Sequence, residues 1–221
     1  MKPAAFLFDL DGTLLDTEAL WTEAIVEWLA DRGAKTTADE VAPLVFGHSW
    51  LDIQATLHER FPALPKTSAE EDANTLRPYY ARRAVNPASQ IIPGAVDFLR
   101  KVSRIAPCVI VSGSPHDDVV QAAELCGVEN LLRFVLGAED YGRGKPAPDG
   151  YLKAASLLEV DASECVVVED STAGVQAGRA AGMRVIGVDR NQRAPQDFAG
   201  CEWLVHDLSE LDVHVVFGDA E

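Results

Sequence analysis

The sequence predicts an α/β fold, in which a parallel sheet forms the core and an all-helical segment is inserted after the first strand. Short runs rich in valine and isoleucine recur through the second half of the chain and alternate with stretches of helical periodicity. These runs are continuously apolar, which is typical of strands buried on both faces of a parallel sheet. No such run occurs between residues 16 and 90.

The first strand covers the apolar run at 6–8, and predicted helices follow it. The first helix begins at Asp16 or Thr17 and continues to about Gly33, with apolar residues at helical spacing. Further helices are expected over 38–45, 51–61 and 68–85. We therefore expect two domains: a core formed by residues 1–15 and 91–221, and a helical domain formed by residues 16–90.

After residue 90 the chain alternates between helices and strands. The expected helices cover 95–103, 117–125, 149–158 and 172–181. The expected strands cover 107–111, 134–136, 165–168 and 184–188, with a last short edge strand at 203–205. In parallel sheets of this kind, ligands bind at the carboxyl ends of the strands. The polar residues that end the strands are therefore the candidate site.

The composition restricts the partners of the chain. The formal net charge is −16, which argues against nucleic acid and against an anionic membrane surface. No apolar run is long enough to cross a bilayer, and no charged and apolar leader precedes the first strand. We expect a cytoplasmic protein, plausibly a monomer, whose partner is a small metabolite. A phosphorylated metabolite is compatible with the charge if a divalent cation binds beside it.

The cysteines are expected to be structural. They are widely separated and form no C-x-x-C pair, and two of them lie in or beside apolar runs; the four are Cys108, Cys126, Cys165 and Cys201. The five histidines show no metal-binding spacing.

The first strand ends in Asp9 and Asp11, and Gly12 then turns the chain. Residues two apart in a strand share a face, so both carboxylates can point into the same space. Two neighbouring carboxylates raise each other's pKa unless a cation lies between them or the two have different roles. A polar exit from the strand is the alternative interpretation, because Asp and Gly are common in turns.

Three further strand ends carry polar side chains. Ser112 and Gly113 follow the strand at 107–111, where a hydroxyl and backbone N–H groups ahead of a helix suit an anionic oxygen. Lys145 lies between a glycine pair and two prolines, which suits a fixed ammonium that binds a phosphate oxygen. Glu169 and Asp170 follow the strand at 165–168 and, with Asp9, offer the oxygen ligands that Mg²⁺ prefers.

Each of these residues also has a plainer interpretation. Ser112 and Gly113 can simply cap a helix, and Lys145 can be a solvated loop residue. Asp170 can be a helix N-cap. All of these interpretations would have to hold at once for the site to be absent.

Together the four strand ends resemble the motifs of the haloacid dehalogenase superfamily, in the expected order. The motifs are Asp9-Leu10-Asp11-Gly12-Thr13, then Ser112, then Gly144-Lys145-Pro146, then Glu169-Asp170. The helical segment matches the helical cap of subfamily I, inserted in a Rossmann-like core. The stretches at 144–149 and 169–174 resemble the branch that contains sugar phosphatases and beta-phosphoglucomutases.

The resemblance implies a role for each motif residue. Asp9 would be the nucleophile that becomes an aspartyl phosphate, and Asp11 would act as general acid and then general base. Mg²⁺ would bind Asp9, the backbone carbonyl of Asp11 and Asp170, with Glu169 in the outer shell. Ser112, Gly113 and Lys145 would hold the phosphoryl oxygens. Phosphoryl transfer requires mainly positioning and charge stabilisation, which these residue types supply.

The departures from the family's patterns favour hydrolysis of phosphomonoesters. Asp11 argues against dehalogenation, which needs no proton for its leaving group. Mutases of the beta-phosphoglucomutase type carry a histidine where this chain has Trp21, and a basic residue where it has Trp50. We therefore expect a Mg²⁺-dependent sugar phosphatase, with an isomerase of the mutase type and a non-catalytic binding module as alternatives.

The cap residues expected to face the substrate are Trp21, His48 and Trp50, with Arg82 and Arg83 as further candidates. Trp21 can instead belong to the core of its helix, because Trp28 and Leu29 are apolar at helical spacing from it.

Overall fold

The strands of the described residues form one six-stranded parallel sheet. The computed structural model describes residues 2–92, 94–190 and 195–218. Residues 1, 93, 191–194 and 219–221 of the predicted core lie outside the described residues. The strand order is β3-β2-β1-β4-β5-β6, and every neighbouring pair is parallel. The strands are β1 (Ala5–Phe8), β2 (Cys108–Val111), β3 (Leu132–Leu136), β4 (Cys165–Glu169), β5 (Arg184–Val188) and β6 (Trp203–Val205).

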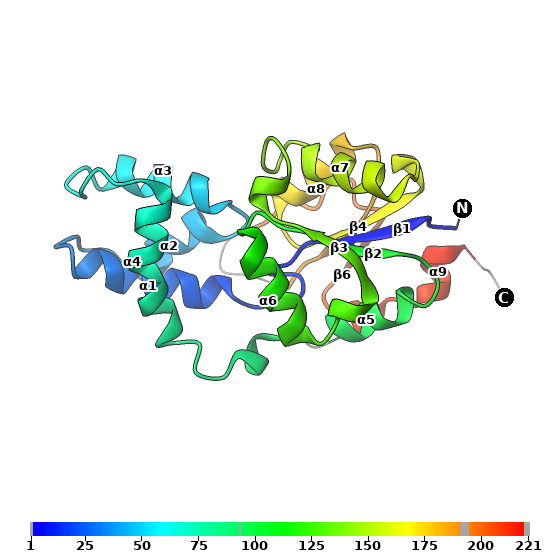
Figure 1. The fold of residues 1–221 in the computed structure, drawn as a ribbon, viewed down its shortest axis with the longest axis horizontal. Helices are drawn as coiled ribbons and strands as arrows, with labels where there is room; N and C mark the ends of the chain where they lie inside the picture. The colour runs from blue at the N-terminus through cyan, green and yellow to red at the C-terminus, as the bar shows by residue number, and fades with distance from the viewer. Residues whose placement is uncertain (1, 93, 191–194, 219–221) are drawn as a thin grey trace.

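Helices cover both faces of this sheet, as Figure 1 shows. One face is covered by α5 (Ala95–Val102), α6 (His116–Cys126) and α9 (Val213–Phe217). The other is covered by α7 (Asp149–Leu158) and α8 (Thr172–Ala180). Alternate residues of β1 supply the two cores: Phe6 and Phe8 face the first group of helices, and Leu7 faces the second. The predicted α/β, Rossmann-like core is confirmed.

The inserted helices pack against one another beside the carboxyl ends of the strands (Figure 1). They are α1 (Glu18–Ala30), α2 (Ala38–Val45), α3 (Trp50–Arg60) and α4 (Ala69–Ala81). Their apolar cluster is separate from the two sheet cores and is centred on residues such as Trp28, Leu57 and Leu76. Capping boxes begin α2 at Thr37 and α4 at Ser68, as their side chains predict. Residues 16–90, all of them described, contain no strand.

The chain enters and leaves this helical group through two adjacent segments. The Asp16 N–H donates to the Gln90 carbonyl at 2.7 Å, and the Ile92 N–H donates to the Leu14 carbonyl at 3.0 Å. Leu15 and Ile91 form an antiparallel bridge between the same segments. The two connections are thus paired into a short ribbon that starts directly after the Asp11 turn.

The structure differs from the sequence-based elements mainly at their ends. Helix α4 ends at Ala81, four residues before the predicted end, because the chain turns at Arg82 to Ala84. Helix α9 was not predicted, since five residues are too few to show helical periodicity.

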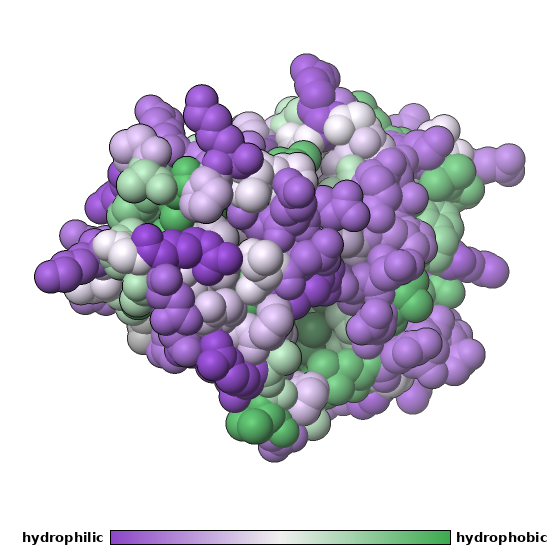
Figure 2. Space-filling model, turned by 60° about the vertical axis from the view of Figure 1, so that its left-hand side comes forward, coloured by the Kyte–Doolittle hydropathy of each residue, from purple (hydrophilic) through white to green (hydrophobic). Residues whose placement is uncertain are grey.

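The surface and the cysteines agree with the composition. No helix among the described residues is long and apolar enough to cross a membrane. The face in Figure 2 is mostly hydrophilic, with hydrophobic residues in separate spots. All four cysteines are free, and burial raises the pKa of the Cys108 thiol to about 12 and that of the other three to about 11. They are protonated at neutral pH.

Candidate active site

The predicted strand-end residues lie together at the carboxyl edge of the sheet. Most of them line a cavity of about 140 Å³ that is bounded on one side by the core and on the other by α1, α3 and α4, whereas Glu169 and Asp170 lie beneath it beside Asp9. The core contributes Asp9, Asp11, Ser112, Gly113 and Lys145. Since β1, β2 and β4 are neighbours in a parallel sheet, their carboxyl ends bring these residues to one place.

Asp9 and Lys145 are in direct contact at the base of the site. Lys145 Nζ donates to Asp9 Oδ1 and also to Glu169 Oε1, the latter at 2.5 Å. Asp9 is 6% exposed and Glu169 is fully buried. The ammonium therefore bridges two carboxylates that come from different strands.

Glu169 is fully occupied by hydrogen bonds. Besides Lys145, its Oε1 accepts from the Tyr151 hydroxyl at 2.8 Å. Its Oε2 accepts from the backbone N–H groups of Asp170 and Ser171 at 3.0 and 3.2 Å. Gly174 leaves room for this carboxylate, because a Cβ there would lie 1.8 Å from it. Glu169 is therefore a fixed negative charge beneath the site.

Asp170 also lies close to Asp9. Its Oδ1 accepts from the Thr13 hydroxyl at 3.1 Å. The Gly12 turn approaches it so closely that a Cβ at Gly12 would lie 2.0 Å from Asp170 Oδ2, and the φ of +89° is a second reason for glycine at this position. The turn after β1 is thus built to admit the carboxylate that follows β4.

The acidic groups leave the base of the site with excess negative charge. Burial raises the pKa of Asp9 well above its usual value, Glu169 and Asp170 raise it further, and Lys145 acts to lower it. Burial acts to lower the pKa of Lys145, but Asp9 and Glu169 outweigh it and hold that pKa above its usual value. The three carboxylates of this cluster and the Lys145 ammonium together carry a formal charge of −3 + 1 = −2.

This arrangement fits a divalent cation. Asp9, Glu169 and Asp170 each offer one oxygen, and these oxygens lie within 4.8 Å of one another. Carboxylate oxygens are the ligands that Mg²⁺ prefers, and a bound cation would offset both the excess charge and the raised pKa of Asp9. Both oxygens of Glu169 already accept hydrogen bonds, which agrees with its predicted place in the outer shell. Asp9 and Asp170 remain the side chains predicted to bind the metal directly.

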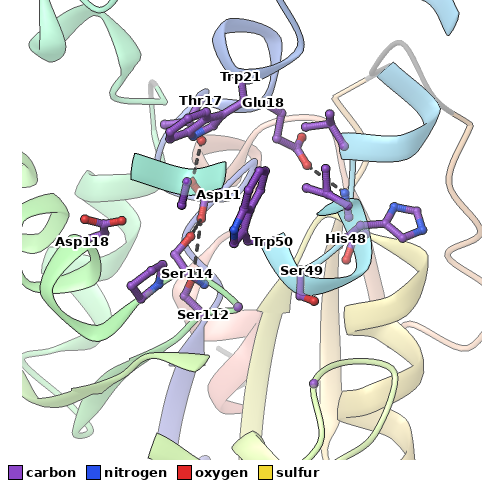
Figure 3. A pocket seen from close by; sticks show the side chains of 18 of the residues that line it. Asp11, Thr17, Glu18, Trp21, His48, Ser49, Trp50, Ser112, Ser114 and Asp118 are labelled. Carbon is purple, nitrogen blue, oxygen red and sulfur yellow. Dashed lines mark hydrogen bonds between the residues drawn. The ribbon is translucent and has the colours of Figure 1, made fainter. Parts of the chain in front are cut away.

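Asp11 is held by a different set of partners (Figure 3). Its Oδ1 accepts from the Thr17 hydroxyl at 2.6 Å, and its Oδ2 accepts from the Ser114 hydroxyl at 2.7 Å. The Ser112 hydroxyl is 3.5 Å from the same Oδ2. Thr17 belongs to the start of the helical segment and Ser114 to the core, so Asp11 joins the two. Asp9 and Asp11 therefore share a cavity but not an environment.

The segment after β2 presents hydroxyl and N–H groups ahead of α6. The Ser114 N–H donates to Ser112 Oγ at 3.0 Å, and the Tyr141 hydroxyl fixes the Ser112 carbonyl at 2.8 Å. Gly113 lines the cavity between the two serines. Anion binding by Ser112 and Gly113 stays a prediction, and their place beside Asp11 ahead of α6 is compatible with it.

Aromatic and apolar residues form the wall opposite the core. Trp21 lines the cavity and stacks on Tyr80, with ring centroids 4.0 Å apart. Trp50 also lines it, and its indole N–H donates to the Ala69 carbonyl at 2.8 Å. His48 lies at the edge, where Nδ1 is 3.0 Å from the Phe46 carbonyl oxygen, and Figure 3 shows its ring pointing away from Asp11.

Two charged residues of the helical segment line the cavity without having been predicted. Glu18 is buried, its Oε1 accepts from the Gly47 N–H at 2.8 Å, and burial with the nearby Asp170 raises its pKa well above the usual value. Arg77, on α4, pairs with Asp118 of α6. Glu18 follows Thr17 directly, but only the docking of α1 against the sheet shows that it faces the acidic cluster.

Arg82 and Arg83 do not line the cavity. Both pair with Glu27 of α1, at 3.2 Å for Arg82 and 2.5 Å for Arg83. They stabilise the packing of α4 on α1 instead of facing the site. His116, the first residue of α6, does not line it either, because its ring lies 2.5 Å from Asp140.

A parallel sheet whose four strand ends carry these groups, closed over by a helical insertion, defines a hydrolase of the haloacid dehalogenase type. A family model described as "haloacid dehalogenase-like hydrolase" matches residues 3–182. The chain belongs to this family and is an enzyme of this class. The resemblance inferred from the four motifs is confirmed.

Individual relatives extend the comparison. Hexitol phosphatase A of Escherichia coli (strain K12) is 32% identical, over 96% of this chain and 95% of that protein. The beta-phosphoglucomutase of Mycobacterium tuberculosis (strain CDC 1551 / Oshkosh) is 30% identical, over 95% of this chain and 92% of that protein. The crystal structure of beta-phosphoglucomutase from Clostridium difficile has a TM-score of 0.82 at 22% identity, covers 98% of this chain and 96% of that one, and shows the shared fold.

Proposed function

We propose that this enzyme is a Mg²⁺-dependent phosphatase that hydrolyses small sugar phosphates or related phosphomonoesters. One observation supports this most: Asp9 contacts Lys145 beside two further carboxylates, whereas Asp11 is held apart by two hydroxyls. The two aspartates are thus suited to different tasks in phosphoryl transfer. Hexitol phosphatase A supports the choice of a sugar or polyol phosphate. We also propose that residues 16–90 act as a cap domain over the core formed by residues 1–15 and 91–221.

In the first step, a carboxylate oxygen of Asp9 forms a bond to phosphorus while the ester bond to the leaving oxygen breaks. Asp11 donates its proton to that oxygen, so the alcohol leaves neutral. Ser112, the Gly113 N–H and Lys145 hold the phosphoryl oxygens. When bound by Asp9, Asp170 and the Asp11 carbonyl, Mg²⁺ supplies charge neutralisation.

In the second step, the aspartyl phosphate at Asp9 is hydrolysed. Asp11, now a carboxylate, accepts a proton from a water molecule, whose oxygen bonds to phosphorus. The bond between phosphorus and the Asp9 oxygen breaks, which releases inorganic phosphate and restores both aspartates. The hydroxyls of Thr17 and Ser114 keep Asp11 facing the reacting oxygen in both steps.

A mutase is the second candidate, because relatives at 30% identity include beta-phosphoglucomutases. In a mutase, a sugar hydroxyl accepts the phosphoryl group in place of water. The Trp21 ring cannot exchange protons, and the indole N–H of Trp50 already bonds to Ala69. These features favour water as the acceptor.

Substitution of the nucleophile tests the mechanism. Asp9→Asn should lower phosphate release from a panel of hexose, pentose and polyol phosphates by at least about a thousandfold with Mg²⁺ present. Asp97→Asn is the control, because this exposed aspartate on α5 is remote from the site. Turnover by pure Asp9→Asn protein at the wild-type rate would rule out the mechanism.

Product analysis separates the two candidates. Incubation with glucose 1-phosphate and a trace of glucose 1,6-bisphosphate should yield inorganic phosphate from a phosphatase. Accumulation of glucose 6-phosphate without free phosphate would instead establish the mutase.

A further inference from the structure

An ion pair joins the helical segment to the core at the edge of the cavity. Arg77 of α4 donates through both terminal guanidinium nitrogens to the two carboxylate oxygens of Asp118 on α6, each at 3.0 Å. Both residues line the cavity. In Figure 3 the Asp118 carboxylate lies well apart from the group formed by Asp11, Ser112 and Ser114. The pair therefore stands where the part of a ligand remote from its reacting phosphoryl group would lie.

Arg77 is one of two Lys or Arg side chains among the described residues that line the cavity. The other, Lys145, pairs with Asp9 and Glu169 at the base. The hydrogen bonds to Asp118 raise the pKa of Arg77 above its usual value. The guanidinium thus remains charged, but Asp118 neutralises it and occupies two of its N–H donors.

The rest of the outer wall offers little to an anion. Apart from Thr17, Glu18, His48 and Ser49, its side chains are apolar or aromatic, such as Ile25, Ile53 and Leu76. The Thr17 and Ser49 hydroxyls donate to Asp11 and Asp52, and burying an unpaired charge against the apolar side chains is costly. A second phosphate beside Arg77 would also meet the negative charge of Asp118. It would have to bind through the three remaining guanidinium N–H groups beside the Asp118 carboxylate, or displace two charge-assisted hydrogen bonds.

We propose that the Arg77–Asp118 pair makes the enzyme selective for substrates with a single phosphoryl group and an uncharged remainder. Asp118 is the determinant, because its removal would leave Arg77 as an unneutralised cation able to bind a second phosphate. This inference rests on the proposed phosphatase function for its substrate class. The pair is partly solvated, with 47% of the Arg77 side chain and 30% of the Asp118 side chain exposed, so its loss should change the fold little.

Binding measurements test the selectivity without requiring turnover. All proteins carry Asp9→Asn, and calorimetry with Mg²⁺ present gives the dissociation constants of glucose 6-phosphate and glucose 1,6-bisphosphate. The reference protein should bind the monophosphate more tightly. Adding Asp118→Asn should lower the dissociation constant of the bisphosphate relative to that of the monophosphate by about tenfold or more. This is the effect expected from one charge-assisted contact.

Two variants isolate the cause. Asp117→Asn removes the same charge from an exposed neighbouring residue and should leave the ratio unchanged. Arg77→Gln added to Asp118→Asn should remove most of the increased preference for the bisphosphate. The inference is overturned if Asp118→Asn leaves the ratio unchanged, if Asp117→Asn changes it equally, or if neither ligand binds the reference protein. A failure of the phosphatase proposal appears separately, as absence of turnover by the wild-type enzyme.

Discussion

At the scale of single residues, the partners of Asp11 are the most informative contacts in the site. Its two oxygens accept from two hydroxyls, one from each side of the cavity. Hydroxyls can rotate to donate to a carboxylate and can accept once it is protonated, so they can serve both of its proposed states. This adaptability suits a residue that donates a proton in one step and accepts one in the next.

Removal of either hydroxyl should slow the chemistry more than it weakens binding. We expect Thr17→Val and Ser114→Ala each to lower kcat by about tenfold to a hundredfold, because Asp11 loses its orientation. KM should change by less than kcat, as steady-state assays with a phosphomonoester can show. Thr36→Val, at an exposed hydroxyl that bonds Glu40, is the matched control. A larger change in KM than in kcat would contradict this role.

The site was predicted best where the sheet itself positions the residue, although the predicted cap residues Trp21, His48 and Trp50 also line the cavity. Asp9, Asp11, Ser112, Lys145 and Asp170 end or follow strands, and parallel strands bring such residues to one edge. Glu18 and Arg77 reach the cavity only because of how the inserted helices dock. That docking depends on contacts between residues far apart in sequence, which a one-dimensional pattern does not contain.

At the scale of helices, the buried carboxylate of Asp72 joins α4 to α3 and to the connection between them. Asp72 of α4 accepts from Gln54 of α3 at 3.0 Å and from the Thr67 hydroxyl at 2.7 Å, and His58 Nε2 lies 2.7 Å from it. Burial acts to raise the pKa of Asp72, but these hydrogen bonds outweigh it and hold the pKa below its usual value. The carboxylate therefore stabilises the folded chain in its ionised form.

The sign of the pH dependence follows from that lowered pKa. The contribution of Asp72 should be complete above about pH 4, the ordinary pKa of an unfolded aspartate, and should be lost as the pH falls through the lower folded value. We expect Asp72→Asn to reduce the free energy of unfolding at pH 7 by about 2 kcal/mol. Urea unfolding from pH 7 to pH 3 should show this difference shrinking at the acidic end. Glu70→Gln, exposed on the same helix, should have almost no effect.

The bounds of helices and strands were predicted well where the element is long or where a capping residue determines its start. Helix α2 has the predicted range because Thr37 and Glu40 form a capping box at its start. The end of α4 was placed too late, since Arg82 to Ala84 form a turn that helical propensity does not distinguish from helix. Short elements such as α9 depend on packing against the core rather than on local sequence.

At the scale of the whole molecule, we expect the acidic cluster to make the stability of the fold depend on a divalent cation. Asp9, Glu169 and Asp170 repel one another, and the ammonium of Lys145 compensates part of the charge of Asp9 and Glu169. A cation that binds the folded chain stabilises it by mass action, by about 2.7 kcal/mol at a concentration one hundredfold above its dissociation constant. For a chain of this size, that corresponds to a rise of about 5–10 °C in Tm.

Thermal unfolding can test this dependence. Addition of MgCl₂ to chelator-treated protein should raise Tm, whereas KCl at equal ionic strength should not. Asp170→Asn should abolish the response to MgCl₂, and its metal-free Tm should equal or exceed that of the wild type because one repulsive charge is gone. Equal responses of the wild type and Asp170→Asn would contradict the assignment of the cluster as the metal site.

The paired connections between the two parts of the molecule have a consequence for how such enzymes diversify. The helical segment leaves the core after Leu15 and rejoins it at Ile91, and these two connecting segments are hydrogen-bonded to each other. An exchange or a change in length of everything between them leaves the strand order and all the strand-end residues untouched. Replacement of the segment between these two adjacent connections is sufficient to place a new binding surface over the same strand-end residues. This modular architecture is compatible with relatives that share the fold but are named for different reactions.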